Sequence, residues 1–128
     1  MSLTNAFETH TLNYLLTTGS VTRPTTWYIG LFTSDPTDTG AAGTEVSGFS
    51  YARTAVTFSV AADVASNTAG VEFPAASGGN WGTIGWIGIM DAASGGNMII
   101  HSALTTAKAI NAGDVFRIPT GDLDITAS

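Results

Sequence analysis

The sequence predicts a mainly β fold, an antiparallel and jelly-roll-like β-sandwich with one N-terminal α-helix. After Pro24, apolar residues recur with a period of two, which is the period of a strand that buries one face. The strand candidates are short and are separated by Gly, Pro, Asn and Asp, as in two-layered antiparallel folds. The chain of 128 residues has the length of one domain, so we expect a single β-sandwich domain over residues 1–128.

The first predicted element is a helix over about residues 4–17. Thr4 or Asn5 can cap its start, Asn5 and Glu8 have the spacing of a capping box, and Gly19 is placed to end it. It is the only helix that the sequence predicts, and we expect it to pack at one end or edge of the sandwich.

The apolar residues of this helix do not form one stripe. Phe7 and Tyr14 share a side, whereas Leu12 and Leu16 lie elsewhere around the helix. We therefore expect the helix to contact protein on two sides, one of which could be a neighbouring subunit.

Eight segments have strand patterns: residues 27–32, 50–60, 71–73, 81–90, 98–104, 108–110, 115–119 and 122–126. The segment 27–32 is apolar on both faces, which predicts a central strand. In the segment 50–60, Val56, Phe58 and Val60 are expected to point inward, with polar residues between them.

Residues 34–48 form a long connection that is rich in Asp, Gly and Pro. Loops of about fifteen residues in compact domains are usually functional or mobile. We therefore expect this loop to contact a partner.

The hexapeptide Ala-Ala-Ser-Gly-Gly-Asn occurs at residues 75–80 and again at residues 92–97. If residues 81–90 form one strand, the two copies lie at its opposite ends and cannot form one site within a single chain. They are expected to be glycine-rich turns, although two subunits could bring them together.

Low charge is the most unusual feature of the composition. Only 11% of the residues are charged, and Lys108 is the single lysine. The centres of protein interfaces are depleted in charge and avoid lysine. This favours a protein that packs against copies of itself or against other proteins, although a weakly charged acidic domain would share the composition.

The net charge of −6 argues against direct binding of nucleic acid, because phosphate binding needs clustered cations. The chain has no cysteine, which excludes disulfides and thiolate metal sites. No signal peptide is evident at residues 1–13, and no run approaches the roughly 20 apolar residues of a membrane span. We expect a protein made in a cytosol, without a membrane partner.

No motif for catalysis or for cofactor binding is present, so no enzyme, cofactor or metal site is predicted. His10 and His101 have no second histidine at ligand spacing. Asp35, Asp38 and Glu45 could offer oxygen atoms to Ca²⁺, but their spacing is not that of an EF-hand and a calcium ion needs more oxygen ligands.

Tyr51 and Arg53 would share a face of a strand, and both residue types are enriched at binding surfaces. Together with Asp35, Asp38 and Glu45 in the loop, they form the predicted partner-binding set. The alternative is that Arg53 pairs with an acid of its own domain, such as Glu45.

Several of these segments together resemble a family of small virion structural proteins of tailed bacteriophages. The matching segments follow the helix and are Tyr28-Ile29-Gly30-Leu31-Phe32-Thr33, Asp35-Pro36, Asp38-Thr39-Gly40, Thr44-Glu45-Val46 with Tyr51 and Arg53, Trp81-Gly82-Thr83-Ile84, Asp91-Ala92, Gly95-Gly96-Asn97 and Ala112-Gly113-Asp114. The family is often labelled as tail fibre protein, and it is similar to capsid cement or decoration proteins. The resemblance implies a component of the virion without catalytic residues.

The small size and the absence of a repetitive shaft favour a capsid cement or decoration subunit, expected to be a trimer that contacts the major capsid protein or other virion proteins. A subunit associated with the tail fibre or tail tip is the alternative. A carbohydrate-binding module is a third hypothesis, because Trp27, Trp81 and Trp86 could stack on sugars, although their apolar strands favour packing in the core.

Overall fold

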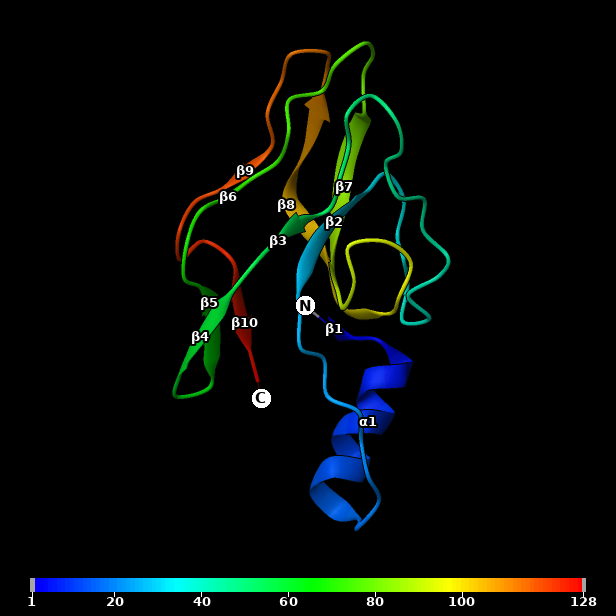
Figure 1. The fold of residues 1–128 in the computed structure, drawn as a ribbon, viewed down its shortest axis with the longest axis vertical. Helices are drawn as coiled ribbons and strands as arrows, with labels where there is room; N and C mark the ends of the chain where they lie inside the picture. The colour runs from blue at the N-terminus through cyan, green and yellow to red at the C-terminus, as the bar shows by residue number, and fades with distance from the viewer. Residues whose placement is uncertain (1, 128) are drawn as a thin grey trace.

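A computed structural model describes residues 2–127 (Figure 1). The elements in chain order are β1 (Ser2–Leu3), α1 (Asn5–Leu16), β2 (Tyr28–Phe32), β3 (Thr54–Ala55), β4 (Phe58–Ala61), β5 (Val64–Asn67), β6 (Val71–Glu72), β7 (Gly82–Met90), β8 (Met98–Ile110), β9 (Arg117–Ile118) and β10 (Asp124–Thr126). The predicted fold class is confirmed, because antiparallel sheets pack together in a sandwich-like arrangement with one N-terminal helix.

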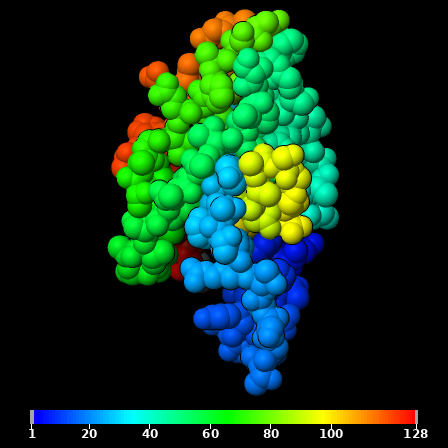
Figure 2. All heavy atoms as spheres, viewed as in Figure 1, coloured from blue at the N-terminus to red at the C-terminus, as the bar shows by residue number. Residues whose placement is uncertain are grey.

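The largest sheet has the order β1-β8-β7-β2-β3. A three-stranded sheet (β10-β5-β4) and a two-stranded sheet (β6-β9) lie beside it, and α1 extends from the lower end of the body (Figures 1 and 2). No helix within residues 2–127 combines the length and apolar composition needed to cross a membrane.

The main core lies on the face of the five-stranded sheet that the smaller sheets cover. Its largest fully buried apolar side chains are Ile29 and Leu31 of β2, Ile84 of β7, and Phe73. On the opposite face, Phe32, Met90 and Met98 form a second, smaller cluster. Strand β2 therefore contributes to a core on each face, as its two apolar faces predict for a central strand.

The segment 50–60 is not one strand, which corrects the prediction. The chain pairs with β2 in the largest sheet at β3 and then moves to the three-stranded sheet at β4. Val56 is buried as expected and Phe58 is half-buried, but Val60 is 73% exposed instead of pointing inward. The passage between the sheets interrupts the alternation, so one face could not stay buried over the whole segment.

Two predicted strands, 98–104 and 108–110, are parts of the single strand β8. Pairing with β7 continues past the polar residues between them, with a register irregularity opposite Ile84 and Trp86. Strands β1 and β5 were not predicted. Strand β5 has the sequence Val-Ala-Ser-Asn, which lacks the alternation of a half-buried strand.

Helix α1 occupies the predicted place, but its ends differ from the prediction. The Thr4 side chain does not cap the helix, because its hydroxyl donates to the Met98 carbonyl of β8 at 2.7 Å. At the other end the helix stops before Gly19: the Thr17 hydroxyl and backbone N–H both donate to the Asn13 carbonyl. Only Phe7 of the helix is buried, so α1 contacts its own chain on one side.

The two hexapeptide copies flank β7, as predicted, one before its start and one after its end. Gly78 in the first copy and both glycines of the second copy, Gly95 and Gly96, have positive φ angles. Left-handed backbone of this kind favours glycine, so the repeated glycines fit the role of turns.

Candidate functional site

The structure brings three of the five predicted partner-binding residues together. Glu45 lies near the end of the long loop and is bridged to the end of β2 at Phe32, and Tyr51 and Arg53 approach it from the segment before β3. A Cβ atom at Gly30 would lie 3.1 Å from Glu45 Oε2. The bare backbone of Gly30 therefore leaves room for the carboxylate above the sheet.

Arg53 uses most of its hydrogen-bond donors within the chain. Its Nε donates to Glu45 Oε2 and its Nη2 to Oε1, both at 2.8 Å. Its Nη1 donates to the carbonyls of Ala92 at 2.9 Å and Gly95 at 2.8 Å. The side chain of Arg53 is only 9% exposed. The arginine thus joins Glu45 to the loop of residues 92–97, and Figure 2 shows this loop in yellow beside the chain around residue 50.

Tyr51 completes this group. Its hydroxyl donates to Glu45 Oε2 at 2.6 Å and accepts the backbone N–H of Leu31 at 3.0 Å. Burial and the hydrogen bond to the carboxylate raise the pKa of Tyr51, so the hydroxyl stays protonated. Burial alone would raise the pKa of Glu45, but hydrogen bonds from Arg53 and Tyr51 and the charge of Arg53 hold that pKa below its ordinary value.

We call Glu45, Tyr51 and Arg53 the charged clamp. Its internal hydrogen bonds correspond to the alternative in which Arg53 pairs with an acid of its own domain. The clamp connects β2, the end of the long loop and the second hexapeptide. Charge-assisted and bidentate bonds of this type are the stronger ones in proteins, so the clamp stabilises three connections at once.

Asp35 and Asp38 lie apart from the clamp. Asp35 Oδ1 accepts the N–H of Thr37 within the loop at 2.9 Å. Asp38 Oδ1 lies 2.9 Å from Nε2 of His101 on β8, and the Asp38 carbonyl accepts the N–H of Asn5 at 2.8 Å. The long loop is therefore attached to both β8 and α1.

Asp35, Asp38 and Glu45 consequently do not converge as calcium ligands. No group of three or more His, Cys, Asp or Glu residues among residues 2–127 could hold a metal ion.

The three tryptophans contribute mainly to packing. Trp81 is 5% exposed, and its Nε1 donates to the Phe49 carbonyl at 2.9 Å. Its ring packs edge to face against Tyr51, with ring centroids 5.3 Å apart. Trp27 and Trp86 are half-buried against the two apolar clusters. The fold therefore uses Trp81 in the core, where it cannot stack on a sugar.

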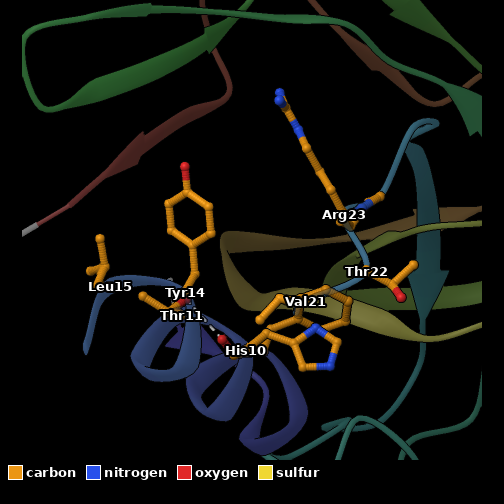
Figure 3. A pocket seen from close by; sticks show the side chains of 9 residues that line it. His10, Thr11, Tyr14, Leu15, Val21, Thr22 and Arg23 are labelled. Atoms are coloured by element: carbon orange, nitrogen blue, oxygen red, sulfur yellow. Dashed lines mark hydrogen bonds between the residues drawn. The ribbon is translucent and has the colours of Figure 1, made fainter. Parts of the chain in front are cut away.

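A hollow lies beside α1, where sequence reasoning placed no site (Figure 3). Its volume is about 430 Å³, and it is lined by Phe7, His10, Thr11, Tyr14, Leu15, Val21, Thr22, Arg23 and Pro24. The His10 ring packs on Phe7, with ring centroids 4.8 Å apart, and its buried Nδ1 has no hydrogen-bond partner among residues 2–127. Figure 3 shows Tyr14 and Arg23 projecting in the same direction from the two walls.

One sequence feature could have indicated this surface. Residues 9–22 contain no Asp, Glu, Lys or Arg. Four large side chains of α1 are also strongly exposed: Leu12 (58%), Tyr14 (76%), Leu15 (65%) and Leu16 (77%). Contiguous exposed apolar side chains mark interaction surfaces more often than single ones do.

The comparisons with known proteins agree with a structural role. A search of curated proteins finds no match. Residues 2–126 match the model of a family described as podophage GP4 fiber I protein gp80, which confirms the resemblance to phage virion proteins and the expected location in the virion. Because this match covers nearly the whole chain, the chain belongs to the podophage GP4 fiber I protein gp80 family of phage virion fibre proteins.

Proposed function

We propose that this fibre protein is a structural subunit associated with the phage tail, held in the particle by protein contacts and without a catalytic role. The observation that carries the proposal is the exposed apolar part of α1, which extends beyond the body of the sheets (Figure 2). A soluble domain that exposes neighbouring leucines usually covers them in its assembly. The family description, which names a fibre, supports a place among the fibre components.

The charged clamp supports the absence of a catalytic role. Four hydrogen bonds from Arg53 end on Glu45 and on backbone carbonyls, and the Tyr51 hydroxyl is engaged on both sides. The three clamp residues line a hollow of about 370 Å³, but their polar groups are already used in these hydrogen bonds, whereas a catalytic acid or nucleophile needs a free polar group for its substrate. The clamp fits a role in stabilising the fold.

Of the five predicted partner-binding residues, we assign partner contact to Asp35 and Asp38. Both residues are exposed on the long loop. Glu45, Tyr51 and Arg53 instead hold the base of that loop. In this proposal the loop presents acidic side chains to a neighbouring virion protein, and the clamp fixes its position.

Capsid cement, the function that small size and the missing shaft favoured, becomes the competing hypothesis. The family description favours the fibre alternative over it. The two hypotheses predict different places for the same chain in the particle.

Mass spectrometry of separated, purified heads and tails tests the proposal directly. We expect the chain in the tail fraction, with a copy number that is a small multiple of the tail symmetry. The proposal would be overturned if the chain were abundant on heads and absent from tails. Phage lacking the gene provides the control, because its tails should lack the corresponding peptides and its fibres should be lost or shortened.

A further inference from the structure

We propose that α1 of one copy docks into the hollow beside Arg23 of a second copy. This inference rests on the proposed function, because it describes how the fibre subunit assembles with itself. Two adjoining sides of α1 support the inference. One side lines a hollow, and the other side faces solvent.

The solvent-facing side carries a leucine stripe, which consists of Leu12 and Leu16, whereas Leu15 lines the hollow. The separation of four residues between Leu12 and Leu16 places them on one side of the helix. Glu8 lies one turn before Leu12 on the same side and is exposed. Glu8 is also the only acidic residue of α1, which contains no Lys or Arg.

The receiving surface is apolar and carries a cation. Arg23 lines the hollow beside α1 and also a second hollow of about 300 Å³ at the mouth between the sheets. The remaining lining of the second hollow is entirely apolar: Trp27, Phe58, Val60, Ala65, Ile89, Ile99, Ile100 and Ile125. We call the two adjoining hollows the Arg23 groove.

Arg23 is available for a partner. It is exposed and makes no ion pair with any residue among 2–127. In Figure 3 its side chain extends into the open space between α1 and the strands above it, alongside Tyr14. No other residue lining the Arg23 groove is formally charged at neutral pH, although Asp91 lines a further hollow that Arg23 also lines.

Charge complementarity selects a second copy as the occupant. Each chain carries a net charge of −6, so two copies repel each other over most of their surface. The leucine stripe with Glu8 and the Arg23 groove are weakly charged exceptions, and their single charges have opposite signs. Each copy therefore offers both halves of one contact, with leucines against apolar side chains and Glu8 near Arg23.

The two halves are different surfaces, so the contact is heterologous. A heterologous contact leaves one free stripe and one free groove until the assembly closes into a ring. A closed ring satisfies every copy. A compact ring of domains is a suitable unit for a fibre.

The test measures the assembly state of the purified chain by native mass spectrometry and by sedimentation across a concentration series. We expect a closed oligomer for the natural sequence. Leu12→Asp and Leu16→Asp should each give a folded monomer, because both leucines are exposed and contribute little to the core. Circular dichroism and thermal unfolding check that these variants remain folded.

Charge reversal tests the pairing itself. Glu8→Arg and Arg23→Glu should each weaken association at least about tenfold, because like charges then face each other. The double variant Glu8→Arg with Arg23→Glu should restore it. Asp122→Arg and Lys108→Glu make the same changes in net charge at exposed positions elsewhere, and they should leave association unchanged.

A monomer at the highest concentrations, or an oligomer that persists in the leucine and Glu8 variants, would overturn the inference. Its failure is distinguishable from failure of the proposed function. A monomeric chain that is still found in purified tails would refute only the self-contact, and an oligomer found only on heads would refute only the tail assignment.

Discussion

The Arg53 guanidinium binds both carboxylate oxygens of Glu45, with each nitrogen–oxygen distance at 2.8 Å. The two residues are eight positions apart and connect the end of the long loop to the chain entering β3. Because Arg53 also holds the Ala92 and Gly95 carbonyls, the pair links the end of the long loop to the turn between β7 and β8.

Arg53→Ala should lower the free energy of unfolding by about 2–3 kcal/mol, because it leaves the half-buried Glu45 carboxylate without its counter-ion and two carbonyls without a donor. Chemical denaturation measures this difference. Arg117→Ala is the matched control, since Arg117 pairs with Glu72 at 3.3 Å on the exposed surface, where ion pairs contribute little. Equal losses for the two variants would contradict a stabilising role for the clamp.

Acid should weaken the fold through Glu45. The folded-state pKa of this carboxyl lies below its ordinary value of 4.5, so the contribution of the ionised group is fully present above about pH 4.5 and is lost as the pH falls through the folded-state pKa. The melting temperature of Glu45→Gln should therefore differ most from that of the natural protein near pH 7. Below pH 4.5 the difference should shrink, and a constant difference would show that Glu45 is not the titrating group.

Gly43→Ala should distort the long loop. A Cβ atom at Gly43 would lie 2.7 Å from the Ser34 carbonyl oxygen and 2.8 Å from the Pro36 nitrogen, and backbone atoms cannot move aside as a flexible side chain can. We expect a loss of about 1–3 kcal/mol in the free energy of unfolding. Gly85→Ala is the control, because no heavy atom lies within 4 Å of its Cβ position.

Thr4→Val should loosen α1 from β8. The Thr4 side chain is buried and its hydroxyl donates to the Met98 carbonyl, so valine keeps the shape but removes the hydrogen bond. We expect a loss of about 1–2 kcal/mol and faster hydrogen exchange at the backbone amides of α1. Thr4→Ser retains the hydroxyl and should keep the slower exchange; if serine and valine behave alike, packing of the methyl group determines the anchoring.

The sequence predicted those elements whose burial follows a simple period. Strand β2 was predicted to be central because Ile29 and Leu31 alternate with Tyr28 and Phe32, and each pair does enter a different apolar cluster. Val60 was misplaced because the chain changes sheets after β3, and no local pattern marks such a change.

The candidate site was less predictable because it depends on contacts between distant segments. The sequence could nominate Glu45 and Arg53 as partners, but not the Ala92 and Gly95 carbonyls, which no side-chain pattern identifies. The Arg23 groove forms because residues 17–27 return beside α1. This segment is irregular, so it has no hydrophobic periodicity from which its position could be predicted.

The pairing of β1 with β8 has a consequence for biosynthesis. Leu3 pairs with Ile100, and Thr4 bonds to Met98, so these residues cannot take their places in the sheet until β8, more than 90 residues later in the chain, has been synthesised. Until β8 has formed, α1 lacks the strand against which it packs, and its leucines are accessible to chaperones. Helix α1, which directly follows Thr4, is thus fixed late relative to its own synthesis.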